Sequence, residues 1–159
     1  MSAIRVQFVC LGNICRSPLA EGVFRHLVAE AGLAAHFQIA SAGTGGWHAG
    51  EAPDPRSTAV ARKNGVDISA QRARALRPQD LDYFDEIRVM DRSNLRDVEA
   101  RMKGKHRARV GLFLDDAQAE RAEVPDPYYG GPQGFDDVYA LVLDGCAGLL
   151  ARLRAAHGL

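Results

Sequence analysis

A chain of 159 residues, 47% hydrophobic and 25% charged, has the size and composition of a globular protein, and we expect residues 1–159 to form a single domain. No apolar run approaches the ~20 residues that a membrane span needs, which argues against a membrane protein. The 20 Lys and Arg residues balance the 20 Asp and Glu residues, so no overall charge favours the binding of nucleic acid.

The first predicted element is a buried strand at residues 4–10 (IRVQFVC), which is short, apolar and rich in β-branched or aromatic residues. The first ten residues lack a basic segment followed by an apolar segment and a cleavage site, so we expect no signal peptide and a cytoplasmic protein. Gly12 and Asn13 then indicate a turn. A helix follows at once, with Ser17 as its N-cap and Pro18 as its first residue.

Strands and helices are expected to alternate along the rest of the chain. These further elements are a strand at 37–42, a helix at 55–64, a strand at 86–90, a helix at 93–102, a strand at 108–114 and a helix at 135–155. The alternation predicts an α/β fold, in which helices flank a four-stranded parallel sheet and ligands bind at the carboxyl ends of the strands. A long loop rich in Gly and Pro (GTGGWHAGEAPDP) follows the second strand and is typical of segments that build sites.

The segment from Cys10 to Arg16 (CLGNICR) joins the first strand to the first helix. A cysteine and an arginine separated by five residues form a weak pattern, which Cys146 and Arg152 repeat inside the last predicted helix, where we expect a buried core cysteine. At Cys10, however, the turn and the start of the helix direct backbone N–H groups and the positive end of the helix dipole toward one place. We therefore expect a phosphate-binding loop after the first strand.

The chemistry expected at this loop is that of a cysteine nucleophile. Positive surroundings favour the thiolate form of Cys10, which can attack phosphorus without a histidine base, and Arg16 offers two N–H donors to two phosphate oxygens. Three cysteines without a C-x-x-C pair fit neither a disulfide framework nor a zinc site. We therefore expect no metal and no other cofactor.

The segment VCLGNICRSPLAE strongly resembles the signature of the low-molecular-weight protein tyrosine phosphatases. The resemblance covers nearly the whole chain, because further motifs occur in that family's order and approximate spacing: SAGT (41–44), GGWHAGEAPDPR, VMDRSNL (89–95) and DPYYGG (126–131). It implies a hydrolase that removes phosphate from phosphotyrosine and small aryl phosphates through a phosphocysteine intermediate at Cys10. Arg16 would bind the phosphate and stabilise the transition state. The implied partners are tyrosine-phosphorylated proteins, with a cognate tyrosine kinase as a further candidate.

The resemblance also implies a general acid. The tyrosine oxygen is a poor leaving group unless it is protonated, and the family uses the aspartate of its Asp-Pro-Tyr segment, here Asp126, which later acts as base on the attacking water. Without the phosphate-binding loop, this Asp-Pro pair would indicate only a turn. Trp47, Tyr128 and Tyr129 match family aromatics that line a slot above the cysteine, which favours aryl phosphates. His48 fits either a specificity role or a plain loop residue.

Several further residues are assigned to the phosphate site through the resemblance. The remaining phosphate-binding residues are Leu11, Gly12, Asn13, Ile14, Cys15 and Ser17. Asn13 resembles a family asparagine that holds the loop in a left-handed conformation, which Asn tolerates. Ser17 resembles a serine whose hydroxyl stabilises the thiolate, although helix capping explains it equally well. Ser41 resembles a serine that anchors Asn13 from the neighbouring strand.

Asp91 and Gln71 are the two remaining positions that we expect to support the site. Asp91 resembles a family aspartate near the site, and for it we favour a structural role at the end of a strand. Gln71 stands where many members carry a histidine of the hydrogen-bond network around the loop. A glutamine can donate and accept but cannot become cationic, so we expect the network to persist with an altered pH response.

Three other functions remain as alternatives. A thiol-dependent arsenate reductase shares the anion loop but needs further cysteines near residues 80–90, where none occurs. A protein-arginine phosphatase carries threonine where this chain has Ile14, and the isoleucine favours phosphotyrosine. A non-catalytic phosphate-binding module would lack the nucleophile or the acid, whereas Cys10 and Asp126 are both present.

Cys15 is a second cysteine within the loop, five residues after Cys10. An accessible thiolate is oxidised first, and the curl of the loop could bring the two sulfur atoms within bonding reach. We therefore expect mild peroxide to form a reversible disulfide between them, with a small buried packing residue as the alternative role for Cys15.

Overall fold

The computed structural model describes residues 2–159 and contains one sheet of four parallel strands in the order β2-β1-β3-β4. The strands are β1 (Ile4–Cys10), β2 (Phe37–Gly43), β3 (Glu86–Val89) and β4 (Arg109–Leu112). The central strand β1 pairs with β2 along its whole length, from Ile4 opposite Phe37 to Cys10 opposite Gly43. The predicted α/β fold with a four-stranded parallel sheet is confirmed.

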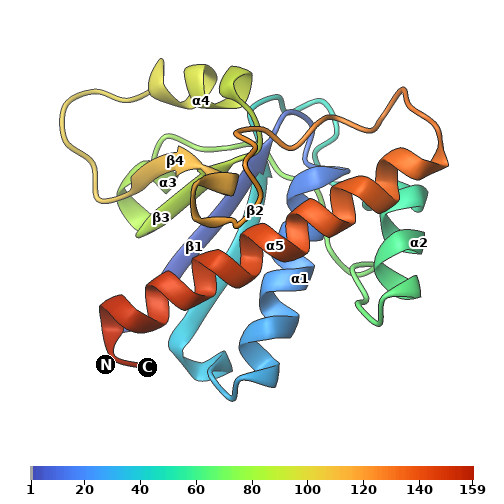
Figure 1. Ribbon diagram of the computed structural model, residues 1–159. Coiled ribbons are helices and arrows are strands. Elements are labelled where there is room, and N and C mark those ends of the chain that lie inside the picture. The colour runs from blue at the N-terminus through green and yellow to red at the C-terminus, as the bar shows by residue number, and fades with distance from the viewer. Residues whose placement is uncertain (1) are drawn as a thin grey trace.

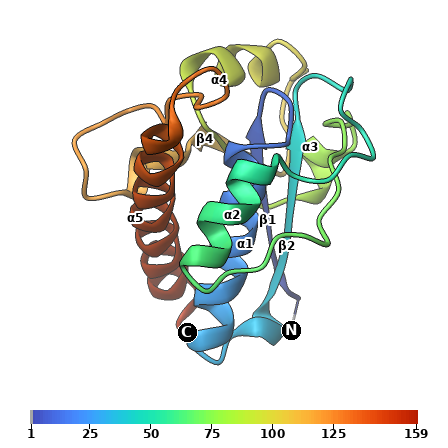
Figure 2. The same cartoon turned by 90° about the vertical axis from the view of Figure 1, so that its right-hand side faces the viewer.

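Helices cover both faces of this sheet (Figure 1, Figure 2). One side carries α1 (Arg16–Glu30), α2 (Pro55–Lys63) and α5 (Pro132–His157), and the other carries α3 (Asp80–Tyr83) and α4 (Arg92–Glu99). Side chains of β1 alternate between the faces, so Val6 and Phe8 join the apolar cluster with α1 and α5, whereas Val9 joins the cluster with α3 and α4. Within the described residues, no helix combines the length and the apolar character needed to cross a membrane.

The start of α1 differs from the prediction in one functional detail. The helix begins at Arg16, and Cys15 occupies the N-cap position without a side-chain hydrogen bond. The prediction of Ser17 as the cap is therefore wrong, because Ser17 lies in the first turn with its hydroxyl turned to Cys10. Pro18 is the third residue of the helix, where its missing N–H is still tolerated because first-turn N–H groups have no acceptor within the helix.

The last strand is shorter and the last helix longer than predicted. β4 ends at Leu112 because residues Phe113–Asp116 form a 3₁₀ turn that packs against α5. α5 starts at Pro132 and ends at His157, where Gly158 adopts a φ of 66° that stops the helix. The one-turn helix α3 has no counterpart in the prediction, since four residues are too few to show a helical period.

Three loops from distant parts of the sequence meet at the carboxyl edge of the sheet, at the top of Figure 1. The N–H of Thr44 donates to the carbonyl of Cys10 at 2.9 Å, which joins the loop after β2 to the loop after β1. The N–H of Val124 donates to the carbonyl of Met90 at 2.8 Å, which ties the segment before α5 to the end of β3. The fold therefore brings the segments carrying Trp47, Cys10 and Asp126 to one place.

Candidate active site

The loop between β1 and α1 (residues 11–15) curls around the sulfur of Cys10. Asn13 has a φ of 58° and is the one non-glycine residue within residues 2–159 with a positive φ, as expected from its left-handed role. Its backbone N–H donates to Cys10 Sγ at 3.3 Å. Since α1 starts directly after this loop, its free first-turn N–H groups add to the donors at this end of the helix.

A buried hydrogen-bond network supports the same sulfur. The side-chain amide nitrogen of Asn13 donates to Ser17 Oγ at 2.7 Å and to Ser41 Oγ at 3.0 Å, and its amide oxygen accepts from the backbone N–H of Arg74 at 3.0 Å. Ser17 Oγ lies 3.0 Å from Cys10 Sγ. Because Ser17 accepts from Asn13, its own hydrogen is free to donate to the sulfur.

Arg16 lies almost fully buried beneath the loop, with 2% of its surface exposed. Its Nη1 donates to Asp91 Oδ2 at 2.6 Å and to the carbonyl of Val124 at 2.9 Å. Asp91 also caps α4, because its other oxygen accepts from the N–H of Asn94 at 2.8 Å. Asp91 thus has the structural place at a strand end that the sequence indicated and, in addition, orients Arg16.

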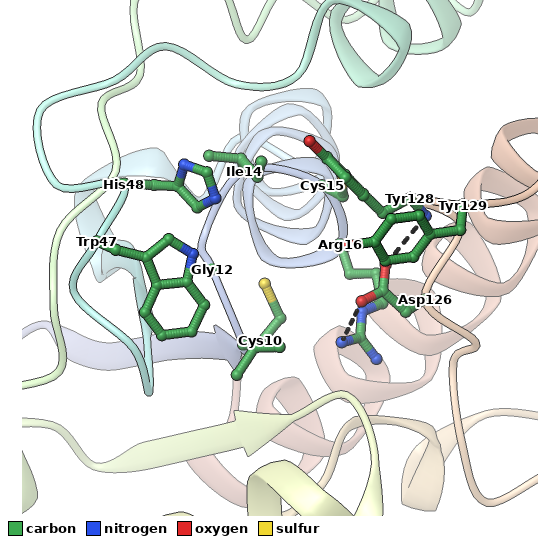
Figure 3. Close-up of a pocket in the computed structure, with 11 residues that line it drawn as sticks. Cys10, Gly12, Ile14, Cys15, Arg16, Trp47, His48, Asp126, Tyr128 and Tyr129 are labelled. Atoms are coloured by element: carbon green, nitrogen blue, oxygen red, sulfur yellow. Dashed lines mark hydrogen bonds and ion pairs between the residues drawn. The ribbon is translucent and has the colours of Figure 1, made fainter.

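Asp126 approaches this arginine from the segment before α5. Its Oδ2 lies 3.7 Å from Arg16 Nη2, and its Oδ1 accepts from the backbone N–H of Tyr128 at 3.1 Å (Figure 3). The carboxyl group is 44% exposed, so a substrate or water can reach it. Cys10, Arg16 and the carboxyl group of Asp126 therefore share one site.

A cavity of about 310 Å³ opens above Cys10. Its walls are formed by Cys10, Leu11, Gly12, Ile14, Cys15, Arg16, Trp47, His48, Asp126, Tyr128 and Tyr129. Figure 3 shows Trp47 and His48 on one side of the cysteine and Tyr128 and Tyr129 on the other. Trp47 is 64% exposed and Tyr129 is 94% exposed, so both rings present apolar surface at the mouth. Such walls suit a flat aromatic group.

The other two cysteines are buried thiols. Burial, followed by the negative charge of Asp54, raises the pKa of Cys15 to about 12. Cys146 lies wholly inside α5, where burial raises the pKa of its thiol well above the ordinary value, and its sulfur donates to the carbonyl of Ala20. The prediction of Cys146 as a core cysteine is confirmed.

Gln71 does not join the network around the loop as the sequence suggested. Its amide nitrogen donates to the carbonyl of Pro18 at 3.0 Å and so stabilises α1, while a backbone N–H, that of Arg74, occupies the amide oxygen of Asn13. His48 lines the cavity, and its Nδ1 lies 2.9 Å from Glu51 Oε2. Within residues 2–159, no group of three or more His, Cys, Asp or Glu side chains could hold a metal ion.

Two residues at the site were assigned no role from the sequence, although each ends a segment that carries the family resemblance. Arg56 donates to the carbonyl of Tyr128 at 3.0 Å and to the carboxylate of Asp54, which links the start of α2 to the segment carrying Asp126. Glu21 accepts a hydrogen bond from Ser41 Oγ at 2.6 Å. Both contacts depend on how distant segments pack, so the motifs alone could not show which partners these residues bind.

Comparisons with known proteins agree on one family. The family model described as low molecular weight phosphotyrosine protein phosphatase matches residues 5–158. A protein of that description from Schizosaccharomyces pombe is 50% identical over 143 residues, which cover 89% of this chain and 91% of the relative. Among solved structures, YfkJ from Bacillus subtilis superposes with a TM-score of 0.93 at 40% identity, covering 99% of this chain and 98% of that chain. A Drosophila arginine phosphatase superposes with a TM-score of 0.88 at 31% identity, covering 95% and 98%.

Proposed function

Since the chain belongs to the low molecular weight phosphotyrosine protein phosphatase family and is a protein tyrosine phosphatase, we propose that it hydrolyses phosphotyrosine through a phosphocysteine intermediate on Cys10. The observation that supports this most directly is the meeting of Cys10, Arg16 and Asp126 in one aromatic-walled cavity. Tyrosine-phosphorylated proteins are the proposed substrates. A cytoplasmic location and a cognate kinase stay predictions from the sequence.

In the first step, the phosphate dianion binds to the N–H groups of the loop and to the guanidinium of Arg16. The Cys10 thiolate attacks phosphorus, so that the S–P bond forms while the bond from phosphorus to the tyrosine oxygen breaks. Asp126 gives its proton to that oxygen, and tyrosine leaves neutral. Arg16, whose Nη1 is oriented by Asp91, stabilises the charge on the transferring phosphoryl group.

In the second step, the Asp126 carboxylate takes a proton from a water molecule, which attacks phosphorus. The S–P bond breaks, inorganic phosphate leaves, and the thiolate of Cys10 is restored. The hydroxyl of Ser17, 3.0 Å from the sulfur, stabilises the thiolate both as nucleophile and as leaving group. Asp126 ends the cycle protonated and ready for the next substrate.

Two substitutions test these roles together. Cys10→Ser is expected to reduce turnover of every substrate below about 1% of wild type while phosphate still binds, because serine keeps the shape but provides no accessible anion.

Asp126→Asn is expected to lose on the order of 10²–10⁴ in kcat for phosphotyrosine but much less for nitrophenyl phosphate, because nitrophenolate leaves without a proton. Steady-state kinetics on aryl phosphates of graded leaving-group basicity measure both.

The outcomes separate the proposed roles from their alternatives. Turnover above about 1% of wild type in Cys10→Ser would remove Cys10 as nucleophile. An equal loss for all leaving groups in Asp126→Asn would leave Asp126 a loop-positioning residue. Phosphoserine, phosphoarginine and arsenate serve as comparison substrates for the wild-type protein. A preference for phosphoarginine would contradict the choice of phosphotyrosine, for which the aromatic walls and Ile14 are the support.

A further inference from the structure

The hydrogen-bond network at Cys10 continues beyond Ser41 to a glutamate on α1. Ser41 Oγ donates to Glu21 Oε1 at 2.6 Å, and Glu21 Oε2 lies 2.7 Å from Arg25 Nη2. A continuous path of hydrogen bonds therefore runs from the surface pair Glu21 and Arg25 through Ser41, Asn13 and Ser17 to the catalytic sulfur.

The middle of this path is buried, and its outer end is exposed to solvent. Ser41 is 6% exposed, Asn13 2%, and Ser17 fully buried, so no bulk water can replace a missing partner there. The Glu21 side chain is 13% exposed and that of Arg25 is 54% exposed. Both line a surface groove of about 550 Å³ between α1 and the segment 65–71, which is separate from the cavity above Cys10.

Glu21 at one end and the backbone N–H of Arg74 beside Asn13 together set the direction of the hydrogen bonds in this path. An ionised carboxylate only accepts, so the Ser41 hydroxyl must donate to it and offers a lone pair to Asn13. The amide NH₂ of Asn13 then donates one hydrogen to Ser41 and the other to Ser17. Its oxygen faces the N–H of Arg74 at 3.0 Å. The hydrogen of the Ser17 hydroxyl is left to point at the sulfur.

If the Ser41 hydroxyl donated to Asn13 instead of to Glu21, the sulfur would lose the hydrogen bond from Ser17. If Ser41 turned its hydrogen toward Asn13, two donors would face each other, and the conflict would be relieved by a flip of the Asn13 amide. The flipped amide would lose the N–H of Arg74 and would accept the hydrogen of Ser17. Cys10 would then keep the backbone N–H of Asn13 but lose the Ser17 hydroxyl.

We propose that Glu21 is a positioning residue for the phosphatase reaction, which acts through Ser41 and Asn13 to keep the Ser17 hydroxyl donating to the Cys10 thiolate. Glu21 is not among the residues that line the cavity above Cys10, and its hydrogen bonds join it to Ser41 and Arg25. The inference rests on the proposed role of Cys10 as nucleophile. It assigns a function to a residue of α1 that lines a separate groove.

Glu21→Gln tests the direction of the bonds while preserving shape. Arg25 carries only donors, so the new amide should turn its oxygen to Arg25 and its NH₂ to Ser41, which reverses Ser41. We expect the alkylation of Cys10 by iodoacetamide at neutral pH to slow on the order of tenfold, with the acidic limb of its pH profile moved to higher pH. The kcat for phosphotyrosine should fall by a similar factor. Mass spectrometry of the Cys10 peptide measures alkylation without reference to turnover.

A rescue variant separates this role from simple support of the fold. In Glu21→Gln/Arg25→Ala the amide oxygen is free to face Ser41, so the alkylation profile should return toward that of wild type. Arg25→Ala alone should match wild type, because the carboxylate still accepts from Ser41. If the double variant is as slow as Glu21→Gln or slower, the bond direction is not what matters and the proposal is wrong.

A second pair tests whether Glu21 acts through Ser41. Ser41→Ala removes the hydroxyl that Glu21 orients, so Ser41→Ala and Glu21→Gln/Ser41→Ala should have equal Cys10 alkylation profiles. A slower Cys10 in the double variant would overturn the proposal. A wild-type protein that fails to hydrolyse phosphotyrosine would instead overturn the proposed function, whereas active wild type with an unchanged Glu21→Gln profile would overturn only the role of Glu21.

Discussion

Cys15 shows how burial changes what a single loop residue can do. Only 4% of its surface is exposed, and burial together with Asp54 raises its pKa to about 12. The thiol is therefore protonated at neutral pH. Both cysteines line the cavity, and Cys10, as the proposed thiolate nucleophile, is the sulfur that reacts with peroxide first. A sulfenic acid on Cys10 becomes a disulfide only when a thiolate of Cys15 attacks it and hydroxide leaves.

The redox prediction from the sequence thus gains a pH dependence. Because the raised pKa keeps Cys15 protonated below about pH 12, its thiolate fraction grows about tenfold per pH unit, and disulfide formation after a peroxide pulse should accelerate steeply from about pH 6 to about pH 9. Mass spectrometry of unreduced peptides follows the link. Cys15→Ala should not recover activity with dithiothreitol after peroxide, and its full recovery would refute the protective role.

At the residue scale, the sequence predicted the roles of residues within consecutive segments and missed the contacts that form only when distant segments pack together. Cys10, Asn13 and Arg16 could be assigned because strand, turn and helix are consecutive in the chain. The sequence leaves two roles for Ser17, and the start of α1 at Arg16 decides against the cap because it places Ser17 inside the first turn. Glu21 ends the segment VCLGNICRSPLAE, but its role could not be predicted, because its contact with Ser41 exists only where α1 passes β2.

At the element scale, α5 packs closely against the 3₁₀ turn at Phe113–Asp116. Two glycines make this possible: a Cβ on Gly145 would overlap the ring of Phe113, and a Cβ on Gly148 would overlap the carbonyl oxygen of Asp116. Glycine is normally unfavourable inside a helix, by about 1 kcal/mol relative to alanine. Here the close approach of two elements requires it.

Gly148→Ala should therefore destabilise the protein, although alanine is the better helix former. We expect a loss of about 1–3 kcal/mol in the free energy of unfolding, because the clash is with backbone and α5 must move away from the turn. Gly134→Ala in the same helix is the control, since its Cβ would meet only Pro127 at an ordinary 3.7 Å, and it should be neutral or slightly stabilising. Urea unfolding compares the two, and a Gly148→Ala protein as stable as the control would contradict this account.

The same turn explains why the fourth strand was predicted too long. The apolar residues Phe113 and Leu114 continue the strand pattern, yet both belong to the turn and are buried in the cluster with α5. Apolar residues alone do not tell a strand from a buried turn. The alternation of elements predicted a parallel sheet, but the order β2-β1-β3-β4 follows from three-dimensional pairing that no single segment encodes.

At the scale of the whole molecule, the site joins four segments that are far apart in the sequence. They are the loop after β1, the loop with Trp47 after β2, Asp91 after β3 and the Asp126–Tyr129 segment before α5 (Figure 1, Figure 3). Arg16, which follows the first of these loops, binds Asp91 after β3 and contacts both Val124 and Asp126 before α5, so that it connects three parts of the chain. An anion bound at Arg16 should therefore stabilise the folded chain as a whole.

Inorganic phosphate should raise the melting temperature through this linkage. At 100 times its dissociation constant, a ligand that binds only the folded state adds about 2.7 kcal/mol, which for a chain of this size corresponds to roughly 5–10 °C. Arg16→Met should lose most of the shift, measured against its own melting temperature without phosphate, because the two-pronged donor is gone and Asp91 and Asp126 are left to repel the dianion. Lys63→Ala, which removes a surface cation that is 64% exposed, should keep the full shift at constant ionic strength. Equal shifts in the two variants would show that phosphate acts through general charge and not through the loop around Cys10.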